Sequence, residues 1–185
     1  LDVPTNSNGT QASHGSSNPS EGYAGIITYI SSAPDYESND DYKEYLIQKL
    51  ETPLVKGAWY TFSFYFSLAE RSAYASPLGV MFSMDQVCQS VFYLDNFSYL
   101  GHITPPLHSR TFWSSSDNSD QNYDPNLLDS TYWHPFQVTF QADSCYEFLT
   151  IGNFSSFADN IYTVNENMTF QQVNGSIDKK AYYYI

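Results

Sequence analysis

Histidines and nucleophile motifs are the first places where this sequence could encode chemistry. Four histidines occur, at His14, His102, His108 and His134. His102 and His108 could share a loop metal, but their spacing matches no ligand motif, so a structural or surface role is favoured. The chain has no GxSxG, HExxH or Walker-type glycine sequence. We therefore expect a protein that is not an enzyme.

Carboxylates gather in two polar segments. The clusters are Asp35, Glu37, Asp40 and Asp41, and then Asp117, Asp120, Asp124 and Asp129. Irregular loops of this kind supply oxygen ligands to calcium, although neither cluster has EF-hand spacing. A glycosidase would need two carboxylates about 5 to 9.5 Å apart across a cleft, which clustering on loops does not establish. Solvated loop charge is the favoured interpretation, and a structural calcium is the alternative.

Aromatic side chains near polar loops are the best candidates for ligand contact. Four aromatic residues lie in or beside loops, where flat rings could stack on a sugar or a partner, namely Trp113, Tyr123, Tyr132 and Trp133. Trp133 directly opens a strand-like segment, so hydrophobic anchoring is favoured for it. The candidate ligand-binding residues, all in or next to the polar tract at 114–122, are Trp113, Tyr123, Asp117 and Asp120.

The two cysteines and five glycosylation triplets leave several alternatives open. Cys88 and Cys145 are 57 residues apart and form no CxxC, so a zinc site is disfavoured, whereas one disulfide and two buried thiols fit equally well. The Asn-X-Ser/Thr triplets begin at Asn8, Asn96, Asn153, Asn167 and Asn174. Because the chain is rich in Asn, Ser and Thr, these triplets indicate surface segments without establishing glycans.

The charge balance excludes several classes of partner. The 185 residues include 7 Lys and Arg against 20 Asp and Glu, a net charge of −13. A nucleic-acid binder needs a basic surface, and anionic membranes repel an acidic one. No segment approaches the roughly 20 apolar residues of a membrane span. We therefore expect neither nucleic acid as a partner nor insertion into a membrane.

The elements that must position these residues are mostly strands. From Trp59 to Leu68, Tyr60 and the following even-numbered residues fall on one face, with Thr61, Ser63 and Ser67 on the other. Gly57 supplies a turn before it. The alternation recurs from Leu78 to Met84 (Val80, Phe82 and Met84 aligned) and from His134 to Gln141 (Phe136, Val138 and Phe140 aligned). We expect two stacked layers to bury the rings of Phe62, Phe64, Phe82, Phe136 and Phe140.

The remaining segments complete an all-β plan. Further strands are predicted at 23–30, 148–152 and 181–185, with a weaker one at 170–173, whereas 42–50 fits either a strand or a helical turn. Residues 85–132 are predicted to be mostly irregular. Residues 1–20 form an irregular lead-in and 21–185 a single β-sandwich domain, an excised or incomplete part of a larger protein. The final strand would leave an open sheet edge for further chain or a neighbour to cover.

In order along the chain, the strand motifs resemble a module of large secreted and outer-surface proteins of Bacteroidota. These are gliding-motility-associated, adhesin-like and type IX-exported proteins. The matching pieces are residues 22–26, 42–46, 53–57, 60–69, 72–75, 78–83, Asp129, Trp133, 136–140, 149–154 and 182–185. The resemblance covers residues 22 to 185, and its specificity lies in the joint order of the pieces.

The resemblance implies a galactose-binding-like, jelly-roll-type β-sandwich of two antiparallel sheets with long loops. It implies a secreted or cell-surface module that recognises carbohydrate or a surface partner without catalysis. The alternatives are a structural subunit or spacer of a filament or long adhesin, with neighbouring domains or copies as partners, and an accessory domain of a secreted hydrolase. Related jelly rolls hold a structural calcium through acidic ends that this chain lacks, so no residue here is assigned to that metal.

Overall fold

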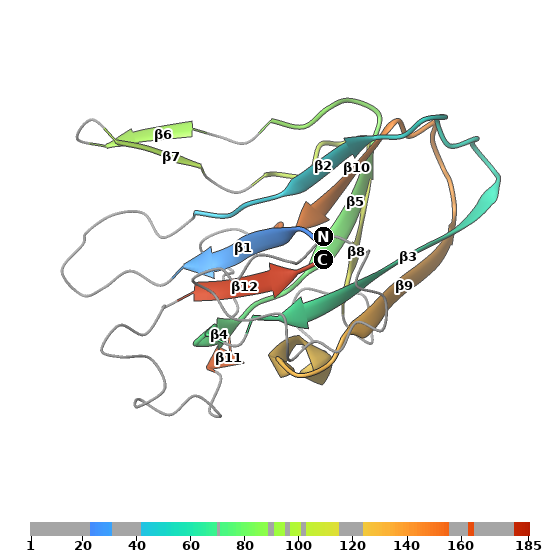
Figure 1. The fold of residues 1–185 in the computed structure, drawn as a ribbon. Coiled ribbons are helices and arrows are strands. Elements are labelled where there is room, and N and C mark those ends of the chain that lie inside the picture. The colour runs from blue at the N-terminus through green and yellow to red at the C-terminus, as the bar shows by residue number, and fades with distance from the viewer. Residues whose placement is uncertain are drawn as a thin grey trace.

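Strands provide almost all of the regular structure in a computed structural model of the chain (Figure 1). The structure describes residues 23–30, 42–69, 71–88, 91–94, 97–100, 103–114, 124–155, 163–164 and 180–185. The candidate strand at 170–173 and the lead-in at 1–20 lie outside these residues. In the described part of the chain, no helix is long and apolar enough to span a bilayer.

Two four-stranded sheets form the body of the molecule. Sheet I has the order β1 (Gly25–Ile30), β12 (Lys180–Tyr184), β3 (Trp59–Leu68), β9 (His134–Gln141). Sheet II has the order β2 (Leu46–Lys49), β10 (Phe148–Gly152), β5 (Gly79–Ser83), β8 (Ser109–Trp113). Every pairing is antiparallel. The prediction of an all-β sandwich with two antiparallel sheets is therefore confirmed.

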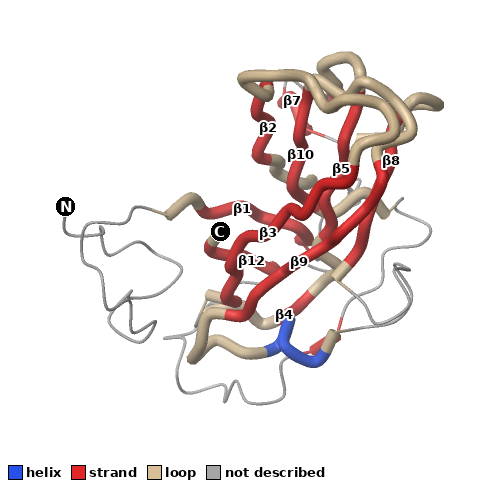
Figure 2. The backbone as a smooth tube through the Cα atoms, turned by 90° about the vertical axis from the view of Figure 1, so that its right-hand side faces the viewer, coloured by secondary structure: helices blue, strands red, loops and turns tan. Residues whose placement is uncertain are grey.

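Smaller elements accompany the two sheets. The pairs are β4 (Tyr74–Ala75) with β11 (Thr163–Val164), and β6 (Val91–Leu94) with β7 (Phe97–Leu100). The short 3-10 helix η2 (Pro125–Leu128) precedes β9. Sheet I and sheet II lie against each other, and β9 and β8 are their edge strands on the same side of the sandwich (Figures 1 and 2).

The aromatic core lies between the sheets, as the alternation predicted. Phe62 from sheet I meets Phe82 from sheet II edge-on at 5.7 Å between ring centroids. Phe140 lies 4.8 Å from Phe82 and 4.9 Å from Phe112, and Phe64 stacks on Phe136 at 4.8 Å. Such ring pairs add to the free energy of simple burial. The predicted burial of these rings is confirmed, because Phe82, Phe136 and Phe140 are buried and Phe62 and Phe64 pack against them.

Strand β5 differs from the sequence interpretation because both of its faces are buried. Val80 and Phe82 join the main core, while Met81 points the other way into a second cluster with Ile103 and Phe154. A strand covered on both faces loses the simple alternation. The expected alignment of Met84 with Val80 and Phe82 in the core is wrong, since β5 ends at Ser83 and Met84 is 40% exposed.

The prediction that residues 85–132 are mostly irregular is wrong in part. This segment contains β6, β7, β8 and η2. The apolar runs of β6 and β7 are separated by two residues, a hairpin spacing that could have revealed them. Strand β8 has only five residues, and it is recognised as a strand mainly because it pairs with β5 along its whole length. Tertiary pairing here outweighed weak local signals.

The pairing of strands β2 and β12 tests two further expectations. The open alternative for 42–50 resolves as a strand, because β2 pairs with β10. Strand β12 pairs with β1 on one side and with β3 on the other. The expected open edge at the final strand is therefore wrong, since β12 is an internal strand of sheet I.

Candidate functional site

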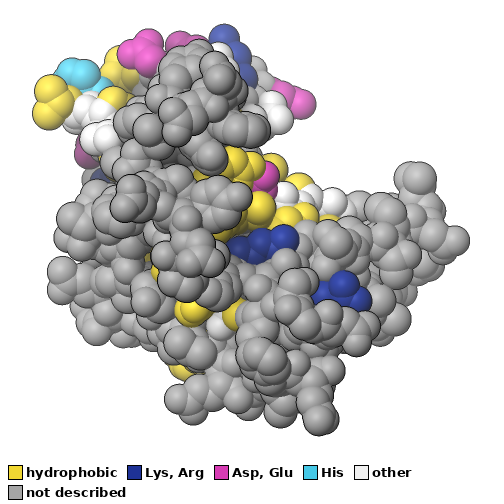
Figure 3. Space-filling model, turned by 90° about the vertical axis from the view of Figure 1, so that its left-hand side faces the viewer, with side chains coloured by type: hydrophobic (Ala, Val, Ile, Leu, Met, Phe, Trp, Pro, Cys, Tyr) yellow, Lys and Arg dark blue, Asp and Glu magenta, His cyan; other side chains and the backbone are white. Residues whose placement is uncertain are grey.

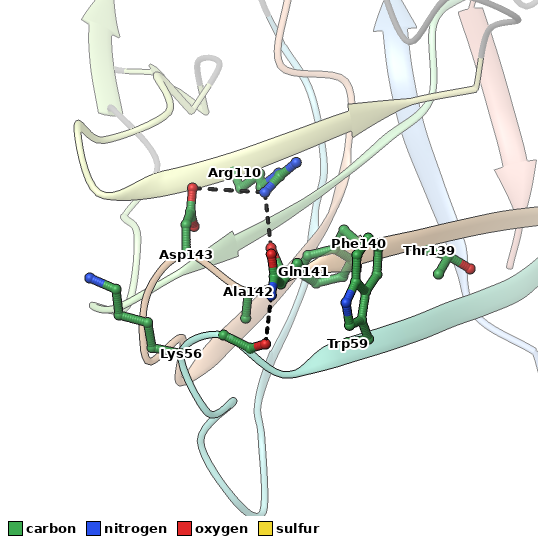
Figure 4. Close-up of a pocket in the computed structure, with 9 residues that line it drawn as sticks. Lys56, Trp59, Arg110, Thr139, Phe140, Gln141, Ala142 and Asp143 are labelled. Atoms are coloured by element: carbon green, nitrogen blue, oxygen red, sulfur yellow. Dashed lines mark hydrogen bonds and ion pairs between the residues drawn. The ribbon is translucent and has the colours of Figure 1, made fainter.

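A surface pocket of about 540 Å³ lies where the edge strands β8 and β9 approach each other (Figure 4). Its side chains come from the turn before β3, from the start of β3, from β8, from the end of β9 and from the two residues that follow β9. We call it the Trp59 pocket and define it by Lys56, Trp59, Arg110, Gln141 and Asp143. The pocket therefore draws on both sheets.

Trp59 supplies the largest apolar surface of the pocket. Its side chain is 69% exposed at the start of β3, although its backbone pairs with Gln141. The turn before it needs Gly57, whose φ of 86° is in the left-handed region that favours glycine. Gly57 N donates to Ala142 O at 2.7 Å, and Gln141 Nε2 donates to Gly57 O at 2.8 Å. These bonds hold the tryptophan beside the end of β9.

Arg110 links the two edge strands. Its Nη1 donates to Gln141 O at 3.1 Å and lies 3.8 Å from Asp143 Oδ2. The guanidinium also lies over the rings of Phe112 and Phe140, at 5.2 and 5.8 Å from their centroids. This cation–π packing orients the planar group. Because a guanidinium has five N–H groups, donors remain to be directed at a ligand.

Asp143 is the acidic member of the pocket. Tyr146 Oη donates to its carboxylate, and this bond, with the positive charges of Arg110 and Lys56, holds the pKa of Asp143 below its ordinary value despite some burial. Burial and the bond to Asp143 raise the pKa of Tyr146 to about 12. At neutral pH Asp143 is therefore an ionised acceptor and Tyr146 a protonated donor that positions it.

The pocket has a charge balance unlike that of the whole chain. Lys56 and Arg110 line it with Asp143 as its one carboxylate, whereas the chain as a whole carries −13. Figure 3 shows another face of the molecule, where described Asp and Glu side chains lie mainly near the upper end together with Lys and Arg, and further Lys and Arg lie beside hydrophobic groups lower down.

The predicted ligand-binding set is not assembled by the described residues. Trp113 lies in β8, partly buried, with its ring 5.9 Å from that of Phe154. It packs in the second cluster and does not line the Trp59 pocket. Tyr123, Asp117 and Asp120 lie outside the described residues. Trp113 is the last residue of β8 and so lies beside a loop, as predicted, but its ring has an apolar neighbour.

The described carboxylates of the second acidic cluster have structural partners. Asp124 caps η2 by accepting from Asn126 N at 3.0 Å. Asp129 accepts from Thr131 N at 2.7 Å and is 2.8 Å from His134 Nε2. In the described ranges, no group of three or more His, Cys, Asp or Glu side chains is placed to hold a metal.

The remaining histidine and aromatic candidates are not brought together at the Trp59 pocket either. His108 is exposed, whereas His102 lies outside the described residues. Trp133 is partly buried with its ring 6.3 Å from that of Tyr23, which fits the anchoring interpretation. Tyr132 is 68% exposed and is not among the residues that line the Trp59 pocket.

Cysteine and glycosylation expectations need two corrections. Cys88 and Cys145 are both exposed and free, so the structure shows neither a disulfide nor two buried thiols. Asn153 is fully buried, its Nδ2 donates to Thr28 O at 3.1 Å, and its Oδ1 accepts from Ser155 N at 3.0 Å. It is unavailable to a glycan in the folded chain. The other triplets, at Asn8, Asn96, Asn167 and Asn174, lie outside the described residues.

The sequence analysis missed every residue that defines the pocket. The strand pattern predicts Trp59 only as the opening of a strand, and no motif marks Lys56, Arg110, Gln141 or Asp143. One available signal was that Trp59 is out of phase with the apolar even-numbered residues that follow it, which places its ring on the outer face. No family model, curated protein or solved structure matches this chain.

Proposed function

We propose that this protein is a non-catalytic module that recognises carbohydrate through the Trp59 pocket. The observation that carries the proposal is a tryptophan ring, 69% exposed, held next to the polar groups of Arg110, Gln141 and Asp143. A large exposed ring is costly to leave in water, and at a pocket it marks a contact surface.

The pocket chemistry suits a sugar. An indole face stacks against the apolar C–H face of a pyranose, while Arg110 donates to hydroxyl oxygens and Asp143 accepts from hydroxyl hydrogens. Glycoside hydrolysis in its usual form needs a pair of carboxyl groups across the bond, and the lining of this pocket contains one, Asp143. These features support binding without turnover.

The strand order supports the finer fold assignment to a jelly roll. Counted along the chain, the eight strands of the two sheets follow 1-8-3-6 in sheet I and 2-7-4-5 in sheet II. Successive strands alternate between the sheets except for the antiparallel pair β5 and β8, as expected of Greek keys rolled into a double sheet. With the resemblance to Bacteroidota surface modules, this order supports a galactose-binding-like module at the outer cell surface or secreted from it.

Glycan binding by matched variants tests the proposal. The wild type, Trp59→Ala and Tyr132→Ala are applied to a polysaccharide array, and hits are titrated by calorimetry. We expect Trp59→Ala to weaken binding about tenfold or more, because stacking is lost. Tyr132→Ala removes an equally exposed ring from elsewhere and should bind like the wild type. Absence of wild-type binding to any glycan, or equal binding by Trp59→Ala, would contradict the proposal.

A structural role as a spacer or filament subunit is the second candidate. It is favoured by exposed apolar side chains that do not line the Trp59 pocket, above all Leu107, which is 99% exposed, and Val55, which is 61% exposed. Such residues could pack against a neighbouring copy. Light scattering over a concentration series distinguishes the two roles, because a subunit should assemble and Leu107→Ser should reduce the assembly.

A further inference from the structure

The outer face of β3 and β9 continues from the Trp59 pocket along sheet I. Its side chains, all exposed, are Trp59, Thr61, Ser63 and Tyr65 of β3 and Gln141, Thr139, Gln137 and Pro135 of β9. We call these eight residues the β3–β9 face. They form four directly opposed pairs, from Trp59–Gln141 to Tyr65–Pro135. In Figure 2 the two strands run side by side across the front of the molecule.

The β3–β9 face has no charged side chain, although the chain carries 27 formally charged Asp, Glu, Lys and Arg residues. Hydroxyl and amide groups occupy its centre, where Thr61 Oγ1 and Thr139 Oγ1 are 2.9 Å apart. These groups can donate and accept hydrogen bonds in turn. The eight residues of the face therefore complement an uncharged partner rich in hydroxyl groups. The charged neighbours Lys56, Arg110 and Asp143 lie at its Trp59 end only.

Exposed aromatic rings stand at both ends of the face. Trp59 is 69% and Tyr65 is 62% exposed. They are six residues apart on one strand, which at the usual rise separates them by roughly 20 Å. That distance exceeds the size of one sugar ring and matches a short oligosaccharide. Since Trp59, Thr139 and Gln141 also line the pocket, the pocket and the face form one continuous surface.

We propose that the ligand is a neutral linear polysaccharide that lies along β3, with one sugar stacked on Trp59 and a later one on Tyr65. This inference rests on the proposed carbohydrate recognition and narrows it to a class of ligand. The sugars between the two rings lie over Thr61 and Ser63 and exchange hydrogen bonds with hydroxyl groups. Affinity then depends on the length of the chain, because a short oligosaccharide reaches one ring only.

The test compares oligosaccharides of two lengths on four proteins. Cello- and manno-oligosaccharides, as disaccharides and hexasaccharides, are titrated by calorimetry into the wild type, Tyr65→Ala, Tyr65→Phe and Trp59→Ala. We expect the wild type to prefer the hexasaccharide. Tyr65→Ala should lose about twofold to tenfold for the hexasaccharide and nothing for the disaccharide, because only the second stacking contact is removed. Tyr65→Phe keeps the ring and should retain the preference.

Two further measurements vary the charge of the oligosaccharide and follow self-association of the protein. An oligogalacturonate of equal length should bind more weakly than the neutral hexasaccharide, and neutral binding should not change with salt. Equal affinity for both lengths, or tighter binding of the uronate, would overturn this inference while leaving carbohydrate recognition intact. Absence of binding to every sugar would remove both proposals. Dimerisation in light scattering that Tyr65→Ala abolishes would show that the face meets a second copy, which also overturns the inference.

Discussion

The outward side chains of β3 in sheet I and of β5 in sheet II differ in burial, although both sheets are four-stranded and antiparallel. On sheet I, the outward residues of β3 from Trp59 to Tyr65 are exposed to solvent. On sheet II, Met81 occupies the outward position of β5 and is fully buried. The difference is therefore not in the strands themselves but in what the chain places over them.

The cover over sheet II is built from segments distant in sequence. Tyr45, Ile103 and Phe154 meet over Met81. Tyr45 Oη donates to Asn153 O at 2.6 Å and accepts from Ile103 N at 2.9 Å, so one hydroxyl ties the three segments together. The comparison teaches that period-two patterning determines the inner face of a strand, whereas long-range contacts decide whether the outer face remains available to a partner.

The largest effect expected from this comparison is at the outward positions of β5 and β3. Met81→Ala should lower the free energy of unfolding by about 3 kcal/mol, because it opens a cavity under Ile103 and Phe154. Ser63→Ala, at an outward position of β3, should change it by less than about 0.5 kcal/mol. Urea denaturation measures both. Equal losses would show that the two outer faces do not differ as described.

The two tryptophans sharpen the contrast. Trp113 packs against Phe154 in β8, so Trp113→Ala should destabilise the fold by about 2 kcal/mol. Trp59→Ala should leave stability within about 0.5 kcal/mol because the ring is 69% exposed. Thermal and urea unfolding of both variants, with the binding measurements above, should separate a packing tryptophan from a binding one. The reverse order of stabilities would refute this assignment.

Substitutions at Gly57 test the turn that positions Trp59. A Cβ at this position would meet no atom within 4 Å, so Gly57→Ala isolates the backbone cost of a φ of 86°. We expect a loss of about 1 kcal/mol. Gly57→Asn should lose less, since asparagine tolerates the left-handed region. Denaturation midpoints provide the comparison, and an unchanged Gly57→Ala midpoint would contradict the expectation.

Asp129 gives the smallest effect and one that depends on pH. Burial acts to raise its pKa, but hydrogen bonds from Thr131 N and His134 outweigh burial and hold the pKa below its ordinary value. A depressed pKa stabilises the fold above the unfolded value and ceases to do so as pH falls through the folded value. Asp129→Asn should therefore cost up to about 1 kcal/mol near neutral pH and nothing in strong acid. A difference independent of pH would contradict this.

The sandwich was predictable because its main strands carry strong local patterns. The boundaries of β3, β9 and β10 follow from alternation or apolar runs bounded by turn residues. Strand β8 was not predictable, since five residues with one buried ring carry little pattern and their pairing with β5 is a long-range event. The burial of β5 on both faces could not be predicted either, because it also depends on long-range contacts.

The site was less accessible to sequence analysis than the fold. Arg110 and Asp143 come together because two edge strands from different sheets converge, and no spacing in the chain records that. The exposure of Trp59 was implied by its phase in β3, but its polar neighbours were not. An exposed ring beside polar groups could therefore be sought from the sequence, but the partial burial of Trp113 and the exposure of Trp59 depend on the fold.

Pro135 has a consequence for how this molecule behaves in crowded surroundings. It sits near the start of β9, the edge strand of sheet I, and opposes Tyr65. Proline has no backbone N–H, so it interrupts the row of donors that an incoming strand would need. Aggregation by strand addition along this edge is thereby discouraged. At high protein concentration, fibre formation through this edge is then disfavoured.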